Sequence, residues 1–394
     1  MRDKVKKLFL AGTLVYLLIG LEILIMISPF AAYFYSVYGP FLVLVDSAAS
    51  TRWLAEFFLP HFVFVDNLFL KILGALQLAT FFSGMFLFLY AAIPLYYSKF
   101  RKQGVLTRGI YERVRHPQYL GLGIAGFGLL LYWPRFFILI TFITMLFVYY
   151  LLAKNEELRM TNSQPETYDE YKKRVPMFLP GNIGGRLFNR VFGPIRPKGL
   201  ALVLLYCVVL FASVGTGMLL RSYSAGAINI NPVNGLSTIS VLPETDFSVP
   251  ELMRSITANQ EIAKRTASGD VTLAYVMPSD FFLMALVTDL ERFYPPDFER
   301  PAGGTTIKRF FKIFSTYTKM QMGIYAEPHP LKRIIFVSVK DADGRLLNGR
   351  DVFRIGARRY PVFHVDLNAQ SREIVSIQDL KHRHKWGTMA MPLF

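Results

Sequence analysis

The chain has 394 residues, of which 53% are hydrophobic and only 18% are charged, and its formal net charge is +16. This hydrophobic share exceeds what one soluble core of that length needs, so the composition indicates a membrane protein. The single cysteine, Cys207, excludes a disulfide framework and a thiolate metal site. The sequence resembles no nucleic-acid-binding module, so nucleic acid is not an expected partner.

Apolar runs of about 20 residues, the length that crosses about 30 Å of hydrocarbon, predict transmembrane helices. Four such runs occupy residues 8–28, 72–96, 134–153 and 199–220. A fifth run, 119–132, is shorter and rich in glycine, and Trp133-Pro134 separates it from the next. We interpret 119–153 as a tight helical hairpin in which the glycines allow close helix approach. The fold class expected is therefore an α-helical polytopic membrane domain of about five transmembrane helices, followed by a soluble α+β domain.

Basic residues predict the orientation, because Lys and Arg collect in short cytoplasmic loops. They cluster before the first span, after the second, and between residues 154 and 198, whereas the loop 29–67 carries Arg52 as its only basic residue. We expect a cytoplasmic N-terminus, and five crossings then leave residues 222–394 outside. The first run is longer than the 7 to 15 apolar residues of a signal peptide, so we expect it to be retained.

Charge also divides the chain into two predicted domains. Residues 1–221 hold 23 basic against 11 acidic residues, and residues 222–394 hold 21 against 17. We expect a transmembrane domain, 1–221, with its motifs in 104–180, and an extracytoplasmic domain, 222–394. The basic inner face should favour anionic lipid headgroups.

Residues 222–394 have the pattern of an α+β domain whose function stays open, with an extracytoplasmic protein partner as one expectation. Strands are predicted at 271–277, 321–326, 333–340, 351–355 and 361–366, and helices at 250–265 and 279–294. Asp343-Gly344 predicts a hairpin turn after the strand that ends near Lys340. His382 and His384, with His364, could be read as a metal cluster, but the basic neighbours of the first two oppose a cation, so no metal is expected.

The chemistry is predicted to lie in residues 104–180, where several motifs follow one another in a specific order. These are Thr107-Arg108-Gly109-Ile110-Tyr111, Val114-Arg115-His116-Pro117-Gln118-Tyr119-Leu120-Gly121, Glu156-Glu157 after the hairpin, and Tyr168-x-x-Tyr171-x-x-Arg174-Val175-Pro176. This order resembles the isoprenylcysteine carboxyl methyltransferase and phospholipid methyltransferase superfamily. The resemblance covers about 80 residues closely. It implies an integral-membrane methyltransferase that binds S-adenosylmethionine on the cytosolic side and methylates a prenylated carboxylate, a phospholipid amine or another lipophilic acceptor.

The residue types suit methyl transfer, in which a protein mainly aligns nucleophile, methyl group and sulfur and excludes water. Pro117 restricts His116 to extended geometry, so we expect a stiff entry into a helix that begins near Gln118. The first amides of that helix have no intrahelical partner and can hold a carboxylate such as that of the cofactor.

The resemblance also implies a set of site residues. Those expected to bind the cofactor are Arg115, His116, Pro117, Tyr119, Gly121, Glu157 and Tyr171, and those expected to be catalytic are Arg174 and Glu156. Adjacent helix positions point about 100° apart, so we expect one glutamate to bind cofactor and the other to pair with a nearby base. Arg174 can bind an anionic group through two hydrogen bonds. The alternatives are a purely structural role for His116, an interfacial anchor at Tyr119 and a membrane-surface helix around Arg174.

Two rival functions remain open. Membrane sterol reductases that use NADPH also look similar around an arginine, a His-Pro pair and a tyrosine, but Gln118 and Leu122 stand where their pattern has an asparagine and an acid. The other rival is a receptor or assembly factor in which the helical half is only an anchor for the outer domain.

Overall fold

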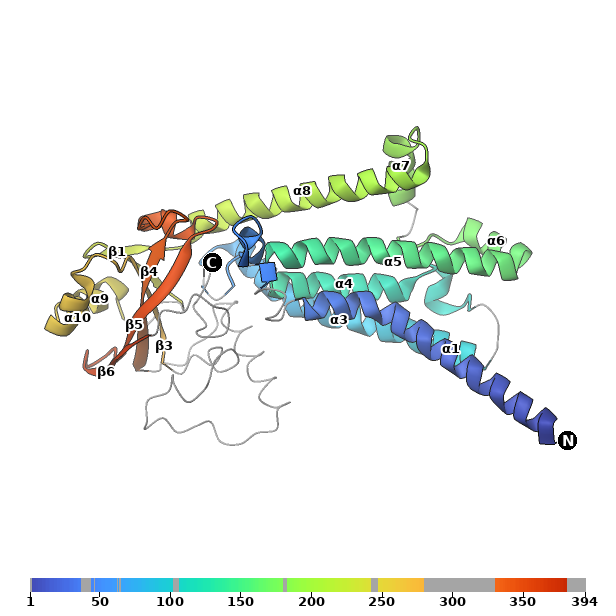
Figure 1. Cartoon of the computed structure of the whole chain (residues 1–394), viewed down its shortest axis with the longest axis horizontal. Helices are drawn as coiled ribbons and strands as arrows, with labels where there is room; N and C mark the ends of the chain where they lie inside the picture. Colours follow the sequence, from blue (N-terminus) through green and yellow to red (C-terminus); the bar gives the residue numbers. More distant parts are fainter. Residues whose placement is uncertain are drawn as a thin grey trace. The chain divides into compact units, whose positions relative to one another are not determined.

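The computed structural model describes residues 2–36, 44–45, 47–61, 63, 65–101, 106–179, 183–241, 247–279 and 330–380. Long helices come first in the chain, and a sheet with two short helices comes last (Figure 1). The chain divides into two compact units. The helical unit comprises Met1–Val37, Leu76–Tyr132 and Ile138–Gly215, and the sheet unit comprises Tyr38–Ala75, Trp133–Phe137 and Thr216–Phe394.

Among the described residues, four helices are long and apolar enough to cross a membrane, which confirms the four long spans predicted from the sequence. They are α1 (Arg2–Tyr35), α3 (Leu68–Phe100), α5 (Phe136–Ser163) and α8 (Lys198–Ala227). The predicted hairpin is formed by α4 (Pro117–Tyr132) and α5. At 1.5 Å per residue, the 16 residues of α4 extend about 24 Å, which is short for a crossing, as its sequence indicates.

Glycines bring α4 close to α3 as well as to its hairpin partner α5. A methyl group added at Gly121 or Gly128 would lie 2.6 or 2.5 Å from a backbone nitrogen of α3, and one at Gly84 of α3 would meet α4 in return. By contrast, Gly126 faces α5, where Met145 Cε would lie 2.8 Å from an added methyl. Two of the four α4 glycines therefore lie against α3 rather than within the hairpin.

Short helices connect the long ones. The 3-10 helix η2 (Gly109–Glu112) lies between α3 and α4, and α6 (Pro165–Arg174) and α7 (Ile183–Phe192) lie between α5 and α8. Proline at the first position of α6 fits its start, because that position needs no backbone donor.

In the described part of the chain, the sheet has six strands in the order β1-β2-β3-β4-β5-β6, with β2 and β3 parallel and every other pair antiparallel. The strands are β1 (Asn231–Val233), β2 (Leu236–Ser240), β3 (Leu273–Pro278), β4 (Leu331–Lys340), β5 (Arg358–Asn368) and β6 (Ile374–Asp379). The helices α9 (Val249–Thr257) and α10 (Gln260–Thr266) cover one face, where Met253 and Ile262 join a core with Phe336 and Phe363. This confirms a helical membrane domain followed by an α+β domain.

The structure confirms the predicted strands at 271–277, 333–340 and 361–366, and it corrects two other predictions. Residues 351–355 form no strand. Gly349 (φ 57°) turns the backbone into the 3-10 helix η6 (Gly349–Phe353), and Arg354 donates its amide to the Asp351 carbonyl where this helix ends. Residues 250–265 form two helices rather than one, because the Asn259 side chain accepts amide hydrogen bonds and caps α10. The predictions for 321–326, 280–294, His382 and His384 fall outside the described residues.

Turn residues account for one confirmed and one unpredicted turn. At the predicted turn, Gly344 (φ 82°) donates its backbone amide to Asp341, and Lys340 then forms a bridge with Leu346. Asn234 (φ 49°) and Gly235 (φ 80°) form the unpredicted turn between β1 and β2, because both positions need a left-handed backbone.

A buried arginine joins three segments of the sheet unit. Arg221, near the end of α8, donates to the carbonyls of Phe57 and Phe353 and lies 3.1 Å from a carboxylate oxygen of Glu56. Arg359 of β5 lies 3.9 Å from the same oxygen. One carboxylate thus links residues before α3, the end of α8 and the sheet.

The α4–α5 connection belongs to the same unit. Phe58 donates its amide to the Pro134 carbonyl at 2.8 Å, and Phe136 donates to the Glu56 carbonyl at 3.1 Å. The connections after α1 and after α4, together with the end of α8, therefore gather with the sheet.

A Gly121→Ala substitution is expected to destabilise the protein by about 1–3 kcal/mol, since the new methyl would press on the backbone of α3. The matched control is Gly123→Ala, whose methyl would meet only the end of the Leu146 side chain, at 3.2 Å. Thermal unfolding in detergent tests this, and equal melting temperatures for the two variants would contradict the packing described.

Candidate active site

A backbone pairing brings two distant motifs together. Arg115 donates its amide to the Pro176 carbonyl at 2.9 Å, and His116 donates to the Met177 carbonyl at 3.1 Å. Pro117 is the first residue of α4, and it holds the preceding residue in an extended conformation that suits this pairing. The turn before α4 is therefore fixed against the segment that follows α6, and the predicted entry into the helix is confirmed.

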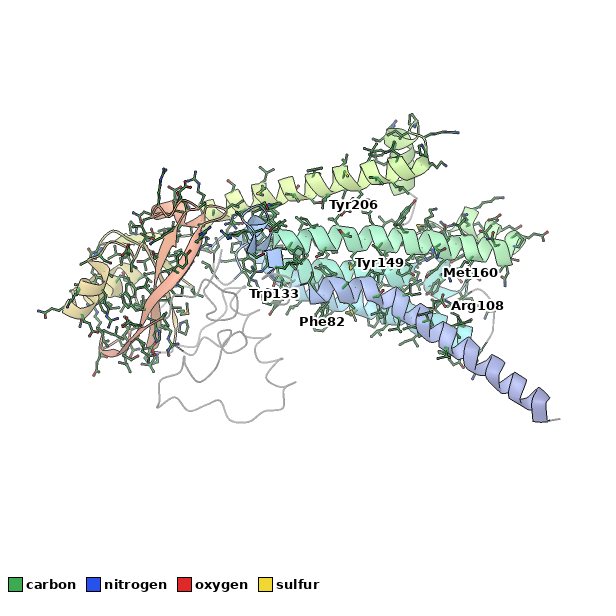
Figure 2. The ribbon with its side chains drawn as sticks, viewed as in Figure 1. Phe82, Arg108, Trp133, Tyr149, Met160 and Tyr206 are labelled. Atoms are coloured by element: carbon green, nitrogen blue, oxygen red, sulfur yellow. The ribbon has the colours of Figure 1, made fainter. Side chains whose placement is uncertain are left out.

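Buried tyrosines hold α6 in place. Tyr171 donates its hydroxyl hydrogen to the Tyr111 carbonyl at 2.6 Å, which joins α6 to η2. Tyr168, Tyr171 and Val175 form a small apolar cluster against Met160 of α5, which is labelled in Figure 2. These contacts position the segment that pairs with Arg115 and His116.

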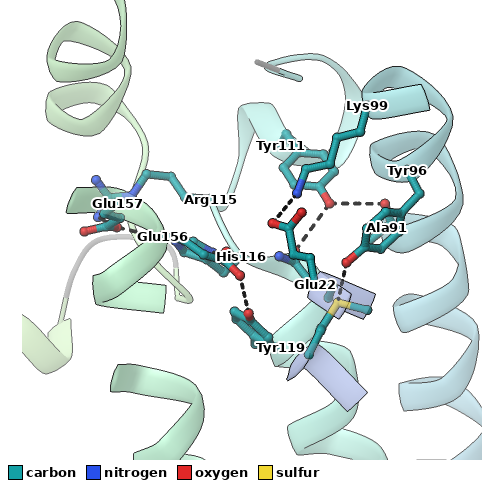
Figure 3. A network of polar contacts seen from close by, with 12 residues as sticks. Glu22, Ala91, Tyr96, Lys99, Tyr111, Arg115, His116, Tyr119, Glu156 and Glu157 are labelled. Carbon is teal, nitrogen blue, oxygen red and sulfur yellow. Dashed lines mark hydrogen bonds and ion pairs between the residues drawn. The ribbon is translucent and has the colours of Figure 1, made fainter. Parts of the chain in front are cut away.

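Five ionisable residues then form what we call the charge cluster: Arg115, His116, Lys154, Glu156 and Glu157. All of them except Lys154 are labelled in Figure 3. Glu157 lies 2.9 Å from the Arg115 guanidinium and 3.4 Å from Lys154 Nζ. The His116 ring lies between the glutamates, with Nδ1 3.4 Å from Glu156 and Nε2 3.5 Å from Glu157. Glu157 thus pairs with a nearby base, as one of the two glutamates was expected to do, while the two nitrogens of the His116 imidazole face both carboxylates. Which glutamate binds cofactor stays a prediction.

Burial makes these contacts energetically important. Glu157 is 1% exposed and His116 is 4% exposed. Burial alone lowers the pKa of His116, but the two carboxylates outweigh it, and the pKa is raised above its ordinary value. The imidazole therefore keeps a positive charge to a higher pH than an exposed histidine does.

Aromatic rings border the charge cluster on one side. Tyr119 donates its hydroxyl hydrogen to Glu156, and its ring stacks on Tyr149 with centroids 4.9 Å apart and on His116 at 5.8 Å. Tyr149, labelled in Figure 2, accepts the amide hydrogen of Phe30 on α1. The stacked rings of Tyr119 and Tyr149 thus border the charge cluster.

The structure brings together most, but not all, of the residues expected at the site. Gly121 lies against α3 as a packing residue, and the Tyr171 hydroxyl is bonded to a backbone carbonyl. Arg174 ends α6 with an exposed side chain, and within the described part of the chain no hydrogen bond or ion pair joins it to the charge cluster. The residues that meet one another are Arg115, His116, Tyr119, Glu156 and Glu157.

Sequence reasoning missed an ion pair near the cluster. Lys99 of α3 lies 2.6 Å from Glu22 of α1, with side chains 22% and 27% exposed (Figure 3). One turn away on each helix, the Tyr96 hydroxyl lies 3.5 Å from the Met26 sulfur. The signal that could have found the pair was Glu22 itself, because an acid inside an apolar span indicates a functional position.

The long apolar helices define a polytopic membrane protein, and the charge cluster lies at the ends of α4 and α5. Residues 72–164 match the phospholipid methyltransferase family, and this segment contains the whole charge cluster. The match confirms the resemblance to the isoprenylcysteine and phospholipid methyltransferase superfamily, and it leaves the C-terminal domain uncharacterised. Residues 72–164 are thus similar to the phospholipid methyltransferase family. No curated protein and no solved structure matches the chain.

The charge on His116 predicts a pH-dependent stability. A histidine whose pKa is raised on folding stabilises the fold fully below its unfolded pKa of about 6.5, and this contribution is lost as pH rises through the folded value. The stability advantage of the native protein over His116→Gln should therefore shrink as the pH is raised from 6. Melting temperatures in detergent measure this difference, and an advantage that is constant or grows with pH would contradict a charged imidazole.

The Glu22–Lys99 pair predicts a non-additive double-mutant cycle. Glu22→Gln or Lys99→Met alone leaves a half-buried charge without its partner, whereas the double variant leaves neither charge. Both single variants should therefore melt at a lower temperature than the double variant. Additive losses in the double variant would show that the two side chains do not interact.

Proposed function

We propose that this protein transfers a methyl group from S-adenosylmethionine to a lipophilic acceptor drawn from the membrane. The observation that carries the proposal is the charge cluster, which lies wholly within the segment that matches the methyltransferase family. A buried set of both carboxylates and cations is suited to a ligand that itself carries charges of both signs.

The residues fit this cofactor chemically. S-adenosylmethionine presents a carboxylate, an ammonium group, a sulfonium and two ribose hydroxyls. In the described part of the chain, Arg115 Nε is buried and no hydrogen bond reaches it, whereas the His116 ring nitrogens and Glu157 Oε1 lie in ion pairs within the charge cluster. Buried polar groups normally have hydrogen-bond partners, so the Arg115 nitrogen supports a site for a polar ligand.

The residues can be given separate binding tasks. Arg115, His116 and the first amides of α4 would hold the carboxylate, since a guanidinium and a helix N-terminus both favour an anion. Glu156 would hold the ammonium group or the ribose hydroxyls, because Glu157 already pairs with Arg115 and Lys154 while the Glu156 side chain is 22% exposed. Tyr119 and Tyr149 offer an aromatic surface for a ring or the sulfonium.

When bound, the cofactor supplies a methyl group on a positively charged sulfur, which leaves readily when a nucleophile attacks in line. The protein contributes alignment and exclusion of water rather than covalent chemistry. For an amine or hydroxyl acceptor, the proton that methylation releases could pass to the Tyr119 hydroxyl as that hydroxyl gives its own proton to Glu156. A carboxylate acceptor needs no base, and Arg174 stays our predicted anchor for an anionic acceptor group.

The acceptor would enter from the lipid. Large apolar side chains on α3 are exposed, with Phe86 72% and Ile93 65% exposed, as expected of a surface in contact with acyl chains. Such a surface is available to a lipophilic tail while the polar centre binds the charged cofactor.

We assign the charge cluster to the cytoplasmic side and the sheet unit to the outside. The basic loops between α3 and α4 and between α5 and α8 support this orientation. The connections after α1 and after α4 belong to the same unit as the end of α8. Five crossings would place these three segments on one side of the membrane, so the grouping is consistent with five crossings. For residues 222–394 we propose contact with an extracytoplasmic protein partner.

Calorimetric titration of the detergent-purified full-length protein with S-adenosylmethionine and, separately, with NADPH tests the proposal. Saturable binding of S-adenosylmethionine is expected, and Glu156→Gln and His116→Gln should each weaken it by about tenfold or more, the effect of losing a charged hydrogen bond.

The matched control is Glu170→Gln, which removes an exposed acid of α6 and should leave the affinity unchanged. Binding of NADPH alone would assign the chain to the reductases instead. Binding of neither compound would leave a non-catalytic anchor for the outer domain.

A further inference from the structure

The helix α7 combines an exposed apolar stripe with exposed arginines. Leu187 and Val191 lie one turn apart and are 61% and 56% exposed, and Arg186 and Arg190 repeat at the same spacing beside them. Positions four apart share one face of a helix, so apolar and basic faces lie side by side. This arrangement is typical of helices that lie in a membrane interface.

Chain connectivity holds α7 near the membrane. Only five residues separate Phe192, where α7 ends, from Lys198, where the spanning helix α8 begins. Five residues extend at most about 18 Å, and turn bonds from Gly193 to Asn189 and from Ile195 to Phe192 shorten this connection. The helix therefore cannot move far from the headgroups that surround the start of α8.

The charge of this region favours anionic headgroups in particular. Between Ile183 and Lys198 the chain carries Arg186, Arg190, Arg196 and Lys198 and no acidic residue. The apolar stripe alone would insert equally into neutral and anionic membranes. A cluster of cations without acids adds an attraction that only a negatively charged surface supplies.

We propose that α7 is an interfacial helix that inserts Leu187 and Val191 among the acyl chains and binds anionic lipid headgroups through Arg186 and Arg190. The inference is independent of the methyltransferase reaction, because none of these residues belongs to the charge cluster. It gives α7 a membrane partner on the side of the bundle where α5 ends and α8 begins.

The test uses the full-length protein in nanodiscs made of phosphatidylcholine alone or of an equal mixture with phosphatidylglycerol. A fluorophore sensitive to polarity is attached at Leu187→Cys in a Cys207→Ser background, which removes the only native thiol. The probe should report an apolar environment in both membranes. A water-like signal in both membranes would overturn the proposal. The exposed apolar stripe of α7 would then be a candidate contact surface for a soluble protein.

The second measurement is the ratio of phosphatidylglycerol to phosphatidylcholine that stays bound after detergent extraction, determined by lipid mass spectrometry. The Arg186→Gln/Arg190→Gln variant should lose this preference on the order of tenfold, and added salt should weaken it in the native protein. The matched control is Arg345→Gln/Arg354→Gln, which removes the same charge from exposed positions of the sheet unit. An unchanged ratio in the α7 variant, or an equal loss in the control, would overturn headgroup binding by α7.

Discussion

The helical unit depends on pairing the charge of Glu157, which is almost completely buried. Arg115 and Lys154 supply the opposite charge, and Arg115 also donates to the Lys172 carbonyl, so one carboxylate links α5, the turn before α4 and α6. Removing one member of such a pair leaves an uncompensated charge in a medium of low dielectric constant, which is strongly destabilising. The same pairing that a binding site requires therefore also holds the connecting segments together.

The length and composition of the apolar runs predict the long helices well. A helix needs about 20 apolar residues to cross the hydrocarbon of a membrane, and few other structures contain so long an apolar run. The sheet is harder to predict from local pattern. The strand β2 is buried along most of its length, so buried and exposed side chains hardly alternate along it. A search for the two-residue period of a strand therefore does not find β2. The Asn234-Gly235 pair before β2 is a strong hairpin signal, yet the strands predicted from the sequence did not include this hairpin. Val352 and Phe353 are apolar like strand residues, but a left-handed Gly349 turns the backbone before them.

The site could be predicted only as a set of residue types in order. Motif order identified Arg115, His116 and both glutamates, but their convergence on one imidazole depends on the backbone pairing with residues 176–177, which no local pattern encodes. Steps of three residues rotate by 300° on a helix, so the stripe that begins at Tyr168 has turned away from the buried face by Arg174. Likewise, the Glu22–Lys99 contact joins two helices. The sequence alone indicates Glu22 as an acid inside an apolar span, but it does not indicate Lys99 as the partner.

The contact between Glu56 and Arg221 has a consequence for biosynthesis. The two residues are 165 positions apart, and at roughly 5–20 residues per second the ribosome reaches the arginine roughly 8–33 s after the glutamate. Until then the carboxylate and the carbonyl of Phe57 lack the cation that joins them to the rest of the unit. The segment before α3 therefore completes these contacts only after the end of α8 has been synthesised.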